Sequence, residues 1–221
     1  MPYRRTENVV RRLAEREQSI VDAARTAAGQ GGMPAVQIAL VAQRAGIASG
    51  TVYRYFPSKS DLVAQLISDV AERALAAMRT AADAAPGPLS ALAAAIASFA
   101  ARVLSERKLT WAVIAEPVDG ESGGARHDFR TALAAELHAR MRVAMAHGYL
   151  PEQDLAVTTP AIVGALLEGL IGPLAPDLTG DAPKIREAVQ TVTLLCLRAL
   201  GVVDARARGL VVQIALDRHD A

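Results

Sequence analysis

Residues 41–59 contain the pattern that most restricts the fold of this chain. They read Val-Ala-Gln-Arg-Ala-Gly-Ile-Ala-Ser-Gly-Thr-Val-Tyr-Arg-Tyr-Phe-Pro-Ser-Lys. This is the spacing of two short helices joined by a turn and followed by the start of a third helix. Gly46 supplies the turn, because glycine enters the left-handed backbone region without a steric penalty. With Ile47 and Val52 filling the crevice between the helices, the pattern predicts a helix-turn-helix.

The second short helix carries side chains suited to nucleic acid on its outward face. They are small, hydroxyl-bearing, aromatic or cationic groups, which contact base edges and phosphates in protein–DNA complexes: Ser49, Gly50, Thr51, Tyr53, Arg54 and Tyr55. Gly50 allows the backbone to come near the duplex. Lys59, at the start of the next helix, is expected to hold a phosphate. The segment is therefore predicted to read double-stranded DNA.

The segment resembles the N-terminal domain of the TetR family of bacterial repressors. The family pattern is roughly Ile-Ala-x-x-Ala-Gly-Val-Ser-x-Gly-Thr-Leu-Tyr-x-Tyr-Phe-x-x-Lys-x-x-Leu. The run from Thr51 to Lys59 makes the resemblance specific, and the close match covers about residues 16–65. Upstream, a helix around Ile20 and a glycine-rich break at residues 29–32 resemble the first helix and loop of the family.

The resemblance implies an all-α protein with two domains. Residues 1–62 form an N-terminal arm and a three-helix DNA-binding domain, and residues 63–221 form a larger helical bundle for ligand binding and dimerisation. The composition agrees, because 52% apolar and 4% aromatic residues favour packed helices over a sandwich or barrel. The third helix is expected to run to about residue 84. Further helical patterns cover residues 90–105, a short stretch around 111, and residues 128–147, 159–171, 184–200 and 204–216.

Two departures from the family pattern concern helix ends. Ala48 stands where the family has Ser or Thr capping the recognition helix, a change that costs about 1 kcal/mol. Ser49 is expected to take over the cap. At the start of the preceding helix the family has Thr or Ser and then a polar or basic residue, whereas this chain has Gln37 followed by Ile38. We predict that Gln37 contacts DNA, and we expect fewer contacts with the DNA backbone at this helix start than in the family.

The N-terminal segment is basic. Residues 1–62 contain nine Lys or Arg and five Asp or Glu, a balance of +4, and the remainder has fifteen against eighteen, a balance of −3. This asymmetry is expected when only one region faces phosphate. Arg4 and Arg5 are therefore predicted to contact DNA. The alternative is a solubilising tail, because charge alone has no sequence specificity.

Two apolar segments near the C-terminus, residues 160–174 and 184–200, predict helices that are covered on more than one face. The first contains small residues that permit close approach of another helix: Gly164, Ala165, Gly169 and Gly172. By the resemblance these helices pair with their symmetry mates. A homodimer is therefore predicted, as a palindromic operator requires. The alternative is that both are core helices of a monomer.

Polar side chains within the apolar body are candidates for orienting a ligand. TetR-like proteins enclose a small-molecule effector in this region, and its binding changes the spacing of the two DNA-binding domains. The candidates are Arg102, His138 and Glu168, with Phe99, Trp111, Met141 and Met145 as walls. The low aromatic content favours an apolar, aliphatic effector. The alternative for each residue is ordinary packing or surface pairing.

The sequence contains short patterns that resemble catalytic or cofactor-binding motifs, but the residues around them do not fit those motifs. Residues 120–124 fit G-x-S-x-G, but the nucleophile elbow needs a buried strand before it, and residues 116–119 read as a turn. Residues 29–31 begin like a dinucleotide-binding motif, yet Pro34 occupies the last glycine position. The four histidines are never three or four residues apart. No catalytic residue, metal site or cofactor is therefore predicted.

The cysteine content and the length of the apolar stretches indicate the cellular compartment in which the protein is expected. The single Cys196 cannot form an internal disulfide, which fits a reducing cytoplasm. The apolar stretches near residues 89–104 and 160–174 do not offer 18 uninterrupted apolar residues. A soluble cytoplasmic protein is expected.

The sequence thus predicts a transcriptional regulator, a repressor released from a palindromic operator by a small molecule. One alternative is an activator of the same fold, because operator position and not sequence decides the sign of regulation. The other is a helical enzyme or carrier whose helix-turn-helix resemblance is fortuitous. That alternative predicts no salt-dependent binding to duplex DNA.

Overall fold

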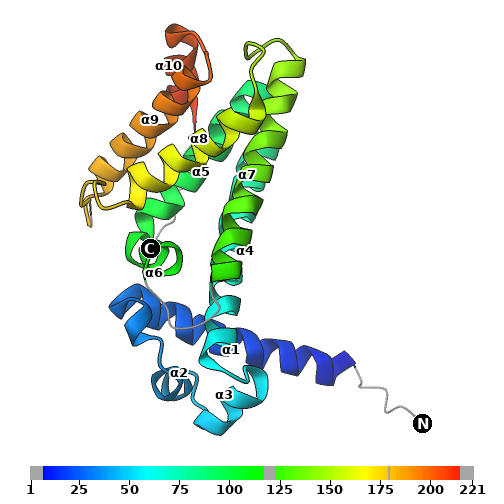
Figure 1. Ribbon diagram of the computed structural model, residues 1–221, viewed down its shortest axis with the longest axis vertical. Helices are drawn as coiled ribbons and strands as arrows, with labels where there is room; N and C mark the ends of the chain where they lie inside the picture. Colours follow the sequence, from blue (N-terminus) through cyan, green and yellow to red (C-terminus); the bar gives the residue numbers. More distant parts are fainter. Residues whose placement is uncertain (1–6, 117–122, 179, 215–221) are drawn as a thin grey trace. The chain divides into compact units, whose positions relative to one another are not determined.

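The computed structural model describes residues 7–116, 123–178 and 180–214, and the regular elements in these ranges are helices (Figure 1). The described elements are, in chain order, α1 (Glu7–Gly31), the 3₁₀ helix η1 (Met33–Ala35), α2 (Ile38–Arg44), α3 (Ser49–Tyr55), α4 (Lys59–Asp83), α5 (Pro88–Ser105), α6 (Arg107–Ile114), α7 (Gly123–Ala146), α8 (Leu155–Ile171), α9 (Ala182–Ala199) and α10 (Asp204–Gln213). The predicted all-α fold is confirmed.

The chain divides into two compact units. Unit 1 comprises residues up to Val70 together with Lys108–Arg126, and unit 2 comprises Ala71–Arg107 together with residues from His127 onward. The boundary falls inside α4 and inside α7, so each of these helices contributes residues to both units. All but the first residue of α6 belongs to unit 1.

Unit 1 has a core of small and branched apolar side chains. α1 packs on η1 and α2, and α2 packs on α3. The buried residues of these helices and of α4 are Ile20, Val21, Ala24, Ala27, Ala28, Val41, Ala42, Val52, Phe56, Leu62, Val63, Leu66 and Ile67. Each fully buried Leu, Ile or Val stabilises the unit by about 1.5–3 kcal/mol relative to an exposed one. This core fixes the positions of the short helices α2 and α3.

Unit 2 is built around α5, which packs against α8, α9 and α10. Eleven of its residues are buried, including Leu92, Ile96 and Phe99. By length and composition α5 also qualifies as a candidate membrane span, the one such helix in the described part of the chain. Because most of it is buried inside the unit, it also has the character of a core helix.

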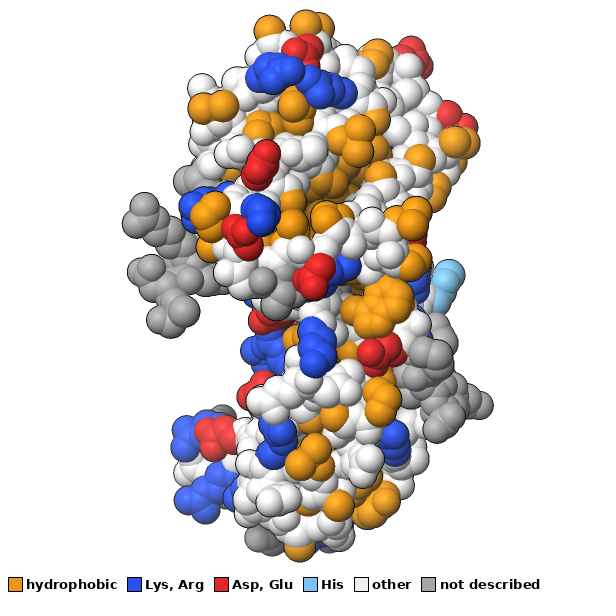
Figure 2. All heavy atoms as spheres, turned by 90° about the vertical axis from the view of Figure 1, so that its left-hand side faces the viewer, with side chains coloured by type: hydrophobic (Ala, Val, Ile, Leu, Met, Phe, Trp, Pro, Cys, Tyr) orange, Lys and Arg blue, Asp and Glu red, His pale blue; other side chains and the backbone are white. Residues whose placement is uncertain are grey.

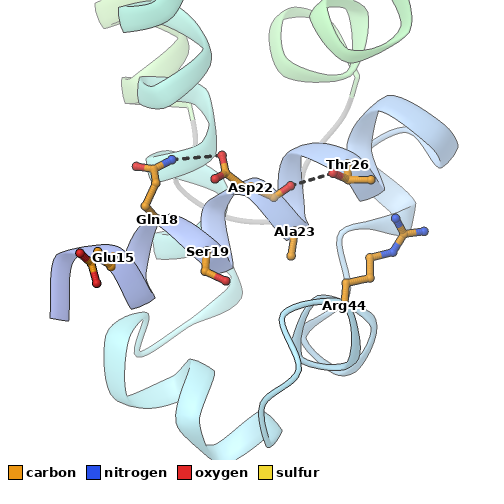
Figure 3. Close-up of a pocket in the computed structure, with 7 residues that line it drawn as sticks. All are labelled: Glu15, Gln18, Ser19, Asp22, Ala23, Thr26 and Arg44. Atoms are coloured by element: carbon orange, nitrogen blue, oxygen red, sulfur yellow. Dashed lines mark hydrogen bonds between the residues drawn. The ribbon is translucent and has the colours of Figure 1, made fainter. Parts of the chain in front are cut away.

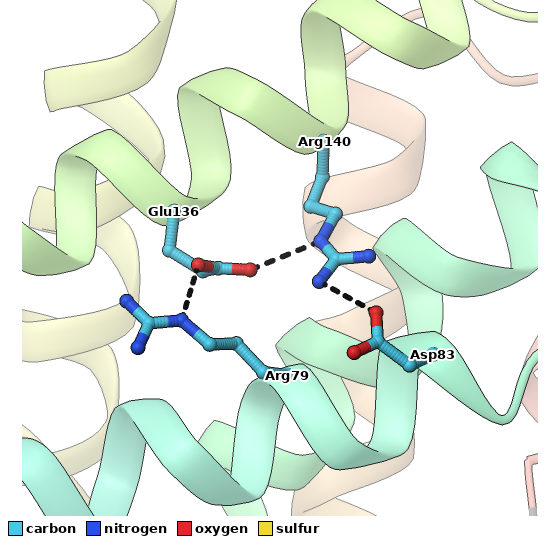
Figure 4. A network of polar contacts seen from close by, with 4 residues as sticks. All are labelled: Arg79, Asp83, Glu136 and Arg140. Atoms are coloured by element: carbon cyan, nitrogen blue, oxygen red, sulfur yellow. Dashed lines mark hydrogen bonds and ion pairs between the residues drawn. The ribbon is translucent and has the colours of Figure 1, made fainter.

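A network of ion pairs joins α4 to α7 within unit 2 (Figure 4). The carboxylate of Glu136 accepts hydrogen bonds from Nε of Arg79 at 2.9 Å and from Nε of Arg140 at 3.0 Å. Arg140 also donates from Nη2 to Asp83 at 3.1 Å. Partial burial disfavours the charged guanidinium of Arg140, but its hydrogen bonds to Glu136 and Asp83 outweigh this, so the pKa of Arg140 is raised.

Several helices begin earlier than the sequence patterns predict. α7 starts at Gly123, five residues before the expected start at residue 128. α8 starts at Leu155, because the carboxylate of Asp154 caps it by accepting the N–H of Ala156 at 2.9 Å. Pro160 therefore lies inside the helix and not in its first turn. The cap from Asp154 thus extends α8 beyond its apolar pattern.

The dismissed sequence motifs fall on helix ends. Residues 29–31 are the last residues of α1, which is preceded by no strand within the described residues. Of the G-x-S-x-G segment, residues 120–122 lie outside the described residues, and Gly123 and Gly124 begin α7.

We expect Cys196 to react with thiol reagents only when the protein opens. Burial raises the pKa of its thiol to about 12, and the thiolate is the reactive form. At pH 8 the native protein should react with Ellman's reagent far more slowly than the urea-unfolded chain, whose cysteine has a pKa of about 8.5. Equal labelling rates in the two states would contradict the buried position.

Candidate nucleic-acid interface

A tight turn joins α2 to α3. Gly46 has a φ of +66°, the left-handed conformation that favours glycine. The N–H of Ile47 donates to the carbonyl of Ala42 at 3.0 Å, and that of Gly46 donates to Gln43 at 3.2 Å. This pair of bonds is a Schellman motif, which satisfies the last carbonyls of α2 and ends the helix. The predicted helix-turn-helix is confirmed.

α3 has one buried face and one exposed face. Val52 and Phe56 are 0% and 4% exposed, whereas Tyr53 is 51% exposed. Of the predicted DNA contacts, the exposed residues are Ser49, Gly50, Tyr53, Arg54, Gln37 and Lys59, and the half-buried ones are Thr51 and Tyr55. The six that lie in α3 therefore share one short helix. Their contact with DNA stays a prediction.

The N-terminus of α3 has no side-chain cap. Its N-cap residue is Ala48, and no side chain accepts a hydrogen bond there. The expectation that Ser49 takes over the cap is wrong, because Ser49 is already the first helical residue. The free N–H groups at this helix end are left to water or to an acceptor on a partner molecule.

The start of α4 is closed by a reciprocal cap. Ser58 Oγ accepts the N–H of Asp61 at 3.1 Å, and the Asp61 carboxylate accepts the N–H of Ser58 at 2.9 Å. Ser58 and Asp61 thus form a capping box at the start of α4. Lys59 is the first residue of α4 and is exposed. Its ammonium group therefore lies at the positive end of a long helix, a favourable place for a phosphate.

The basic N-terminal segment is only partly described. Arg4 and Arg5 lie outside the described residues. α1 begins at Glu7, so Arg11, Arg12 and Arg16 belong to its exposed first turns. Arg11 pairs with Glu15 at 3.5 Å, with both side chains more than 60% exposed, and such pairs contribute little to stability.

The predicted ligand residues have different environments. Phe99 and Met141 are fully buried in unit 2, and the ring of Phe99 lies 6.5 Å from that of Phe129. His138 Nδ1 lies 3.4 Å from Oγ1 of the buried Thr159. The remaining four are a half-buried Arg102 paired with Glu106, an exposed Glu168 on α8, a half-buried Met145, and a half-buried Trp111, which belongs to unit 1.

A hollow that the sequence gave no sign of lies on unit 1 (Figure 3). It has a volume of about 630 Å³ and is lined by Glu15, Gln18, Ser19, Asp22, Ala23 and Thr26 of α1 and by Arg44 of α2. Gln18 donates to Asp22 at 3.2 Å and to Asp69 of α4 at 3.1 Å. None of the predicted ligand residues lines it. In the described part of the chain no group of three or more His, Cys, Asp and Glu is placed to hold a metal ion.

The fold thus combines a helix-turn-helix in unit 1 with a helical unit 2. Comparison with protein families matches residues 20–66 to the bacterial regulatory proteins of the tetR family. Residues 20–66 of the chain are therefore similar to the N-terminal domain of this family.

Among curated proteins, the match is again confined to the N-terminal domain. The chain is 48% identical over 59 residues to the transcriptional repressor KstR of Rhodococcus jostii, which is 27% of this chain and 28% of that protein. It is 53% identical over 49 residues to KstR of Mycobacterium tuberculosis, which is 22% of each. The chain thus matches about a quarter of the length of these relatives.

Solved structures share the fold over most of the chain. RolR in complex with resorcinol has a TM-score of 0.67 at 20% identity and covers 94% of this chain and 98% of its own. FadR of Bacillus subtilis in complex with stearoyl-CoA has a TM-score of 0.70 at 18% identity and covers 82% and 98%. At these identities the likeness concerns the fold alone.

We expect Gly50→Ala to separate stability from DNA binding. A Cβ at Gly50 would meet nothing within 4 Å, so alanine should stabilise α3 by about 0.5–1 kcal/mol. The added methyl group stands where the backbone is predicted to approach the duplex. Binding should weaken roughly tenfold, since a lost base contact costs about 1–3 kcal/mol.

Thermal unfolding and duplex titration measure the two effects of Gly50→Ala. Gly209→Ala is the matched control, because Gly209 lies in α10 with equally open space around its Cα. The control should gain helix stability without any loss of DNA binding. Full DNA affinity in Gly50→Ala would show that the backbone of α3 does not come near the duplex.

Proposed function

We propose that the protein is a transcriptional repressor that binds a palindromic operator as a homodimer and is released from it by a small molecule. Residues 1–62 read the DNA, and residues 63–221 hold the effector and the dimer contacts. The observation that carries this proposal is α3, where Val52 and the C-cap residue Phe56 are buried while Tyr53 and Arg54 are exposed. An apolar inner face fixes the helix, and the outer face is free for the major groove.

The proposed contacts divide by chemistry. Thr51, Tyr53, Arg54 and Tyr55 meet the major groove and its flanking phosphates, whereas Lys59 holds a phosphate at the start of α4. Gln37 and Ser49 add polar contacts at the N-terminal ends of α2 and α3, and Arg4 and Arg5 extend the basic surface. Phosphate contacts position a protein on the duplex, and base contacts select the sequence.

The proposed dimer forms through α8 and α9. Val157 on α8 is 67% exposed, and Leu195 on α9 is 55% exposed. A Cβ at Gly164 or Gly169 of α8 would meet nothing within 4 Å, so another helix can approach closely there. Figure 2, which views the side where α9 lies, shows hydrophobic side chains spread over the surface of unit 2. An apolar surface of this kind is typical of a protein interface.

The proposed effector is a small, mostly apolar molecule held in the body. RolR binds resorcinol and FadR of Bacillus subtilis binds stearoyl-CoA, so this fold accommodates chemically different ligands. In this chain the buried residues of α5 are mostly Ala and Leu, which favours an aliphatic effector. Phe99, Met141 and His138 are the candidates with interior positions. The exposed position of Glu168 favours the dimer surface for that residue.

The proposed regulator has no catalytic activity and acts in the cytoplasm. The relatives matched by sequence are transcriptional repressors, so we propose a regulator without catalytic activity. A cytoplasmic location follows from the proposed operator binding. An activator of the same fold makes the same contacts with DNA and differs in where its operator lies.

Selection of duplexes by the purified protein tests the proposal. The protein is incubated with a random duplex library and with the DNA that flanks its own coding region, and bound molecules are sequenced. We expect a palindromic consensus, bound by two protomers, with an affinity that falls as salt rises. Absence of salt-dependent binding to any duplex at low ionic strength would overturn the proposed function.

Lys59→Ala should weaken binding similarly across sequences. The lost phosphate contact should lower the slope of log affinity against log salt concentration by about one unit for each bound protomer. Titrations of the selected duplex and of a scrambled duplex at several salt concentrations measure this. Lys184→Ala is the control, because Lys184 also lies exposed at the start of a helix, α9, and should leave the slope unchanged. A changed sequence preference with an unchanged slope would contradict the role of Lys59.

A further inference from the structure

The exit of α1 is held by a carboxylate from far along the chain. Glu116, just beyond the end of α6, accepts the backbone N–H of Met33 through Oε2 at 2.5 Å. Both of its carboxylate oxygens lie 2.7 Å from the position that a Cβ on Gly32 would occupy. Gly32 has a φ of +72° and is buried. The carboxylate therefore occupies space that only glycine leaves open.

A second charge from α6 meets the same helix end. The ammonium group of Lys108 donates a hydrogen bond to the backbone carbonyl of Gln30. This carbonyl belongs to the last turn of α1, where carbonyl groups lack partners within the helix and a cation is favoured. Cβ of Leu109 lies 3.9 Å from the position of a Cβ on Gly29. The α6 segment thus places a cation at the carbonyl of Gln30 and an anion at the N–H of Met33.

The end of α6 is itself fixed by Arg126. Its guanidinium group donates from Nε to the carbonyl of Val113 at 2.7 Å and from Nη2 to that of Ala112 at 3.1 Å. It also donates to the carbonyl of Glu116. Three backbone groups around the C-terminus of α6 are therefore satisfied by one charged side chain, which is a strong form of hydrogen bond. Arg126 lies in the first turn of α7, whose later residues belong to unit 2.

The chain from Met33 leads directly into the helix-turn-helix. The N–H of Val36 donates to the carbonyl of Met33 at 3.0 Å, and that of Gln37 donates to Ala35 at 2.9 Å. Gln37 is the N-cap of α2. This connection is short and hydrogen-bonded throughout, so a displacement at Met33 is carried to the start of α2.

We propose that Glu116 is a positioning residue for DNA binding, which fixes the entry to the helix-turn-helix from α6 and makes the affinity for DNA depend on how Arg126 holds the α6 end. This inference rests on the proposed function and names a route for its regulation. Glu116 touches no DNA. It acts on α2 and α3 through the backbone of residues 32–37, and any change that withdraws the end of α6 releases that backbone.

Hydrogen exchange tests the contact without DNA. In Glu116→Ala the amide of Met33 should exchange at least about tenfold faster, because a lost hydrogen bond to a charged group corresponds to roughly that factor or more. Glu116→Gln keeps an acceptor oxygen and should stay close to the original protein. Glu152→Ala, an exposed glutamate in the α7–α8 connection, is the control and should change nothing at residues 29–37. Unchanged exchange in Glu116→Ala would overturn the contact.

Duplex binding tests the positioning role. For the selected duplex, Glu116→Ala should weaken affinity by about fivefold to tenfold with an unchanged salt slope, because the phosphate contacts remain. Glu116→Gln should recover most of the loss. Faster exchange at Met33 combined with unaltered affinity would refute the positioning role while leaving the proposed function intact. Failure to select any duplex would refute the proposed function, whereas the exchange measurement still decides the contact.

A double-mutant cycle with Gly32 distinguishes the specific contact with Glu116 from a general folding defect. Gly32→Ala introduces backbone strain at positive φ and a clash with the Glu116 carboxylate. In the Glu116→Ala background only the strain remains. The loss of duplex affinity caused by Gly32→Ala should therefore be at least about threefold smaller in that background, a coupling expected for residues in contact. Equal losses in the two backgrounds would overturn the proposal even if the single variants fold poorly.

Discussion

The burial of Val52 and Phe56 is the constraint on which the DNA-binding unit depends. α3 has only seven residues, far too few to be stable as an isolated helix, and its first turn has no side-chain cap. Its stability must come from packing, and both side chains are almost fully buried. Because a helix has one inner and one outer face, this same burial turns Tyr53 and Arg54 toward solvent. The interface is thus a consequence of the core.

Polar and charged side chains complete several helix ends, some from neighbouring residues and some from far along the chain. Ser58 with Asp61, Asp154 and Asp181 are local caps within two or three residues of the groups that they bond. The end of α1 instead depends on Lys108 and Glu116, which lie 78 and 83 residues away from their partners. A helix end that is capped by neighbouring residues keeps its hydrogen bonds when other helices move. An end that is capped by residues far along the chain loses them when the distant helix moves.

The features that could be predicted from the sequence are those encoded by neighbouring residues. Gly46 specified the turn, and Val52 was predicted to fill the crevice between the two helices, where it is buried. The resemblance to the TetR family rests on the same short segment. Predictions failed where two local signals competed. The start of α8 was predicted at residue 159, but the cap at Asp154 begins the helix four residues earlier, at Leu155.

By itself, the sequence determined the all-α class, the helix-turn-helix and the outward residues of α3, because helix periodicity and turn geometry act over a few residues. Only the tertiary structure decided that Glu116 lies on Gly32, that Arg126 caps the end of α6, and that Glu136 joins Arg79 to Arg140. In a sequence, a glutamate exposed on the surface cannot be told from one that accepts a hydrogen bond from a distant backbone N–H group, as Glu116 does. Their difference is made by the packing of helices distant in the chain, which places a carboxylate within 3 Å of one N–H group and not another.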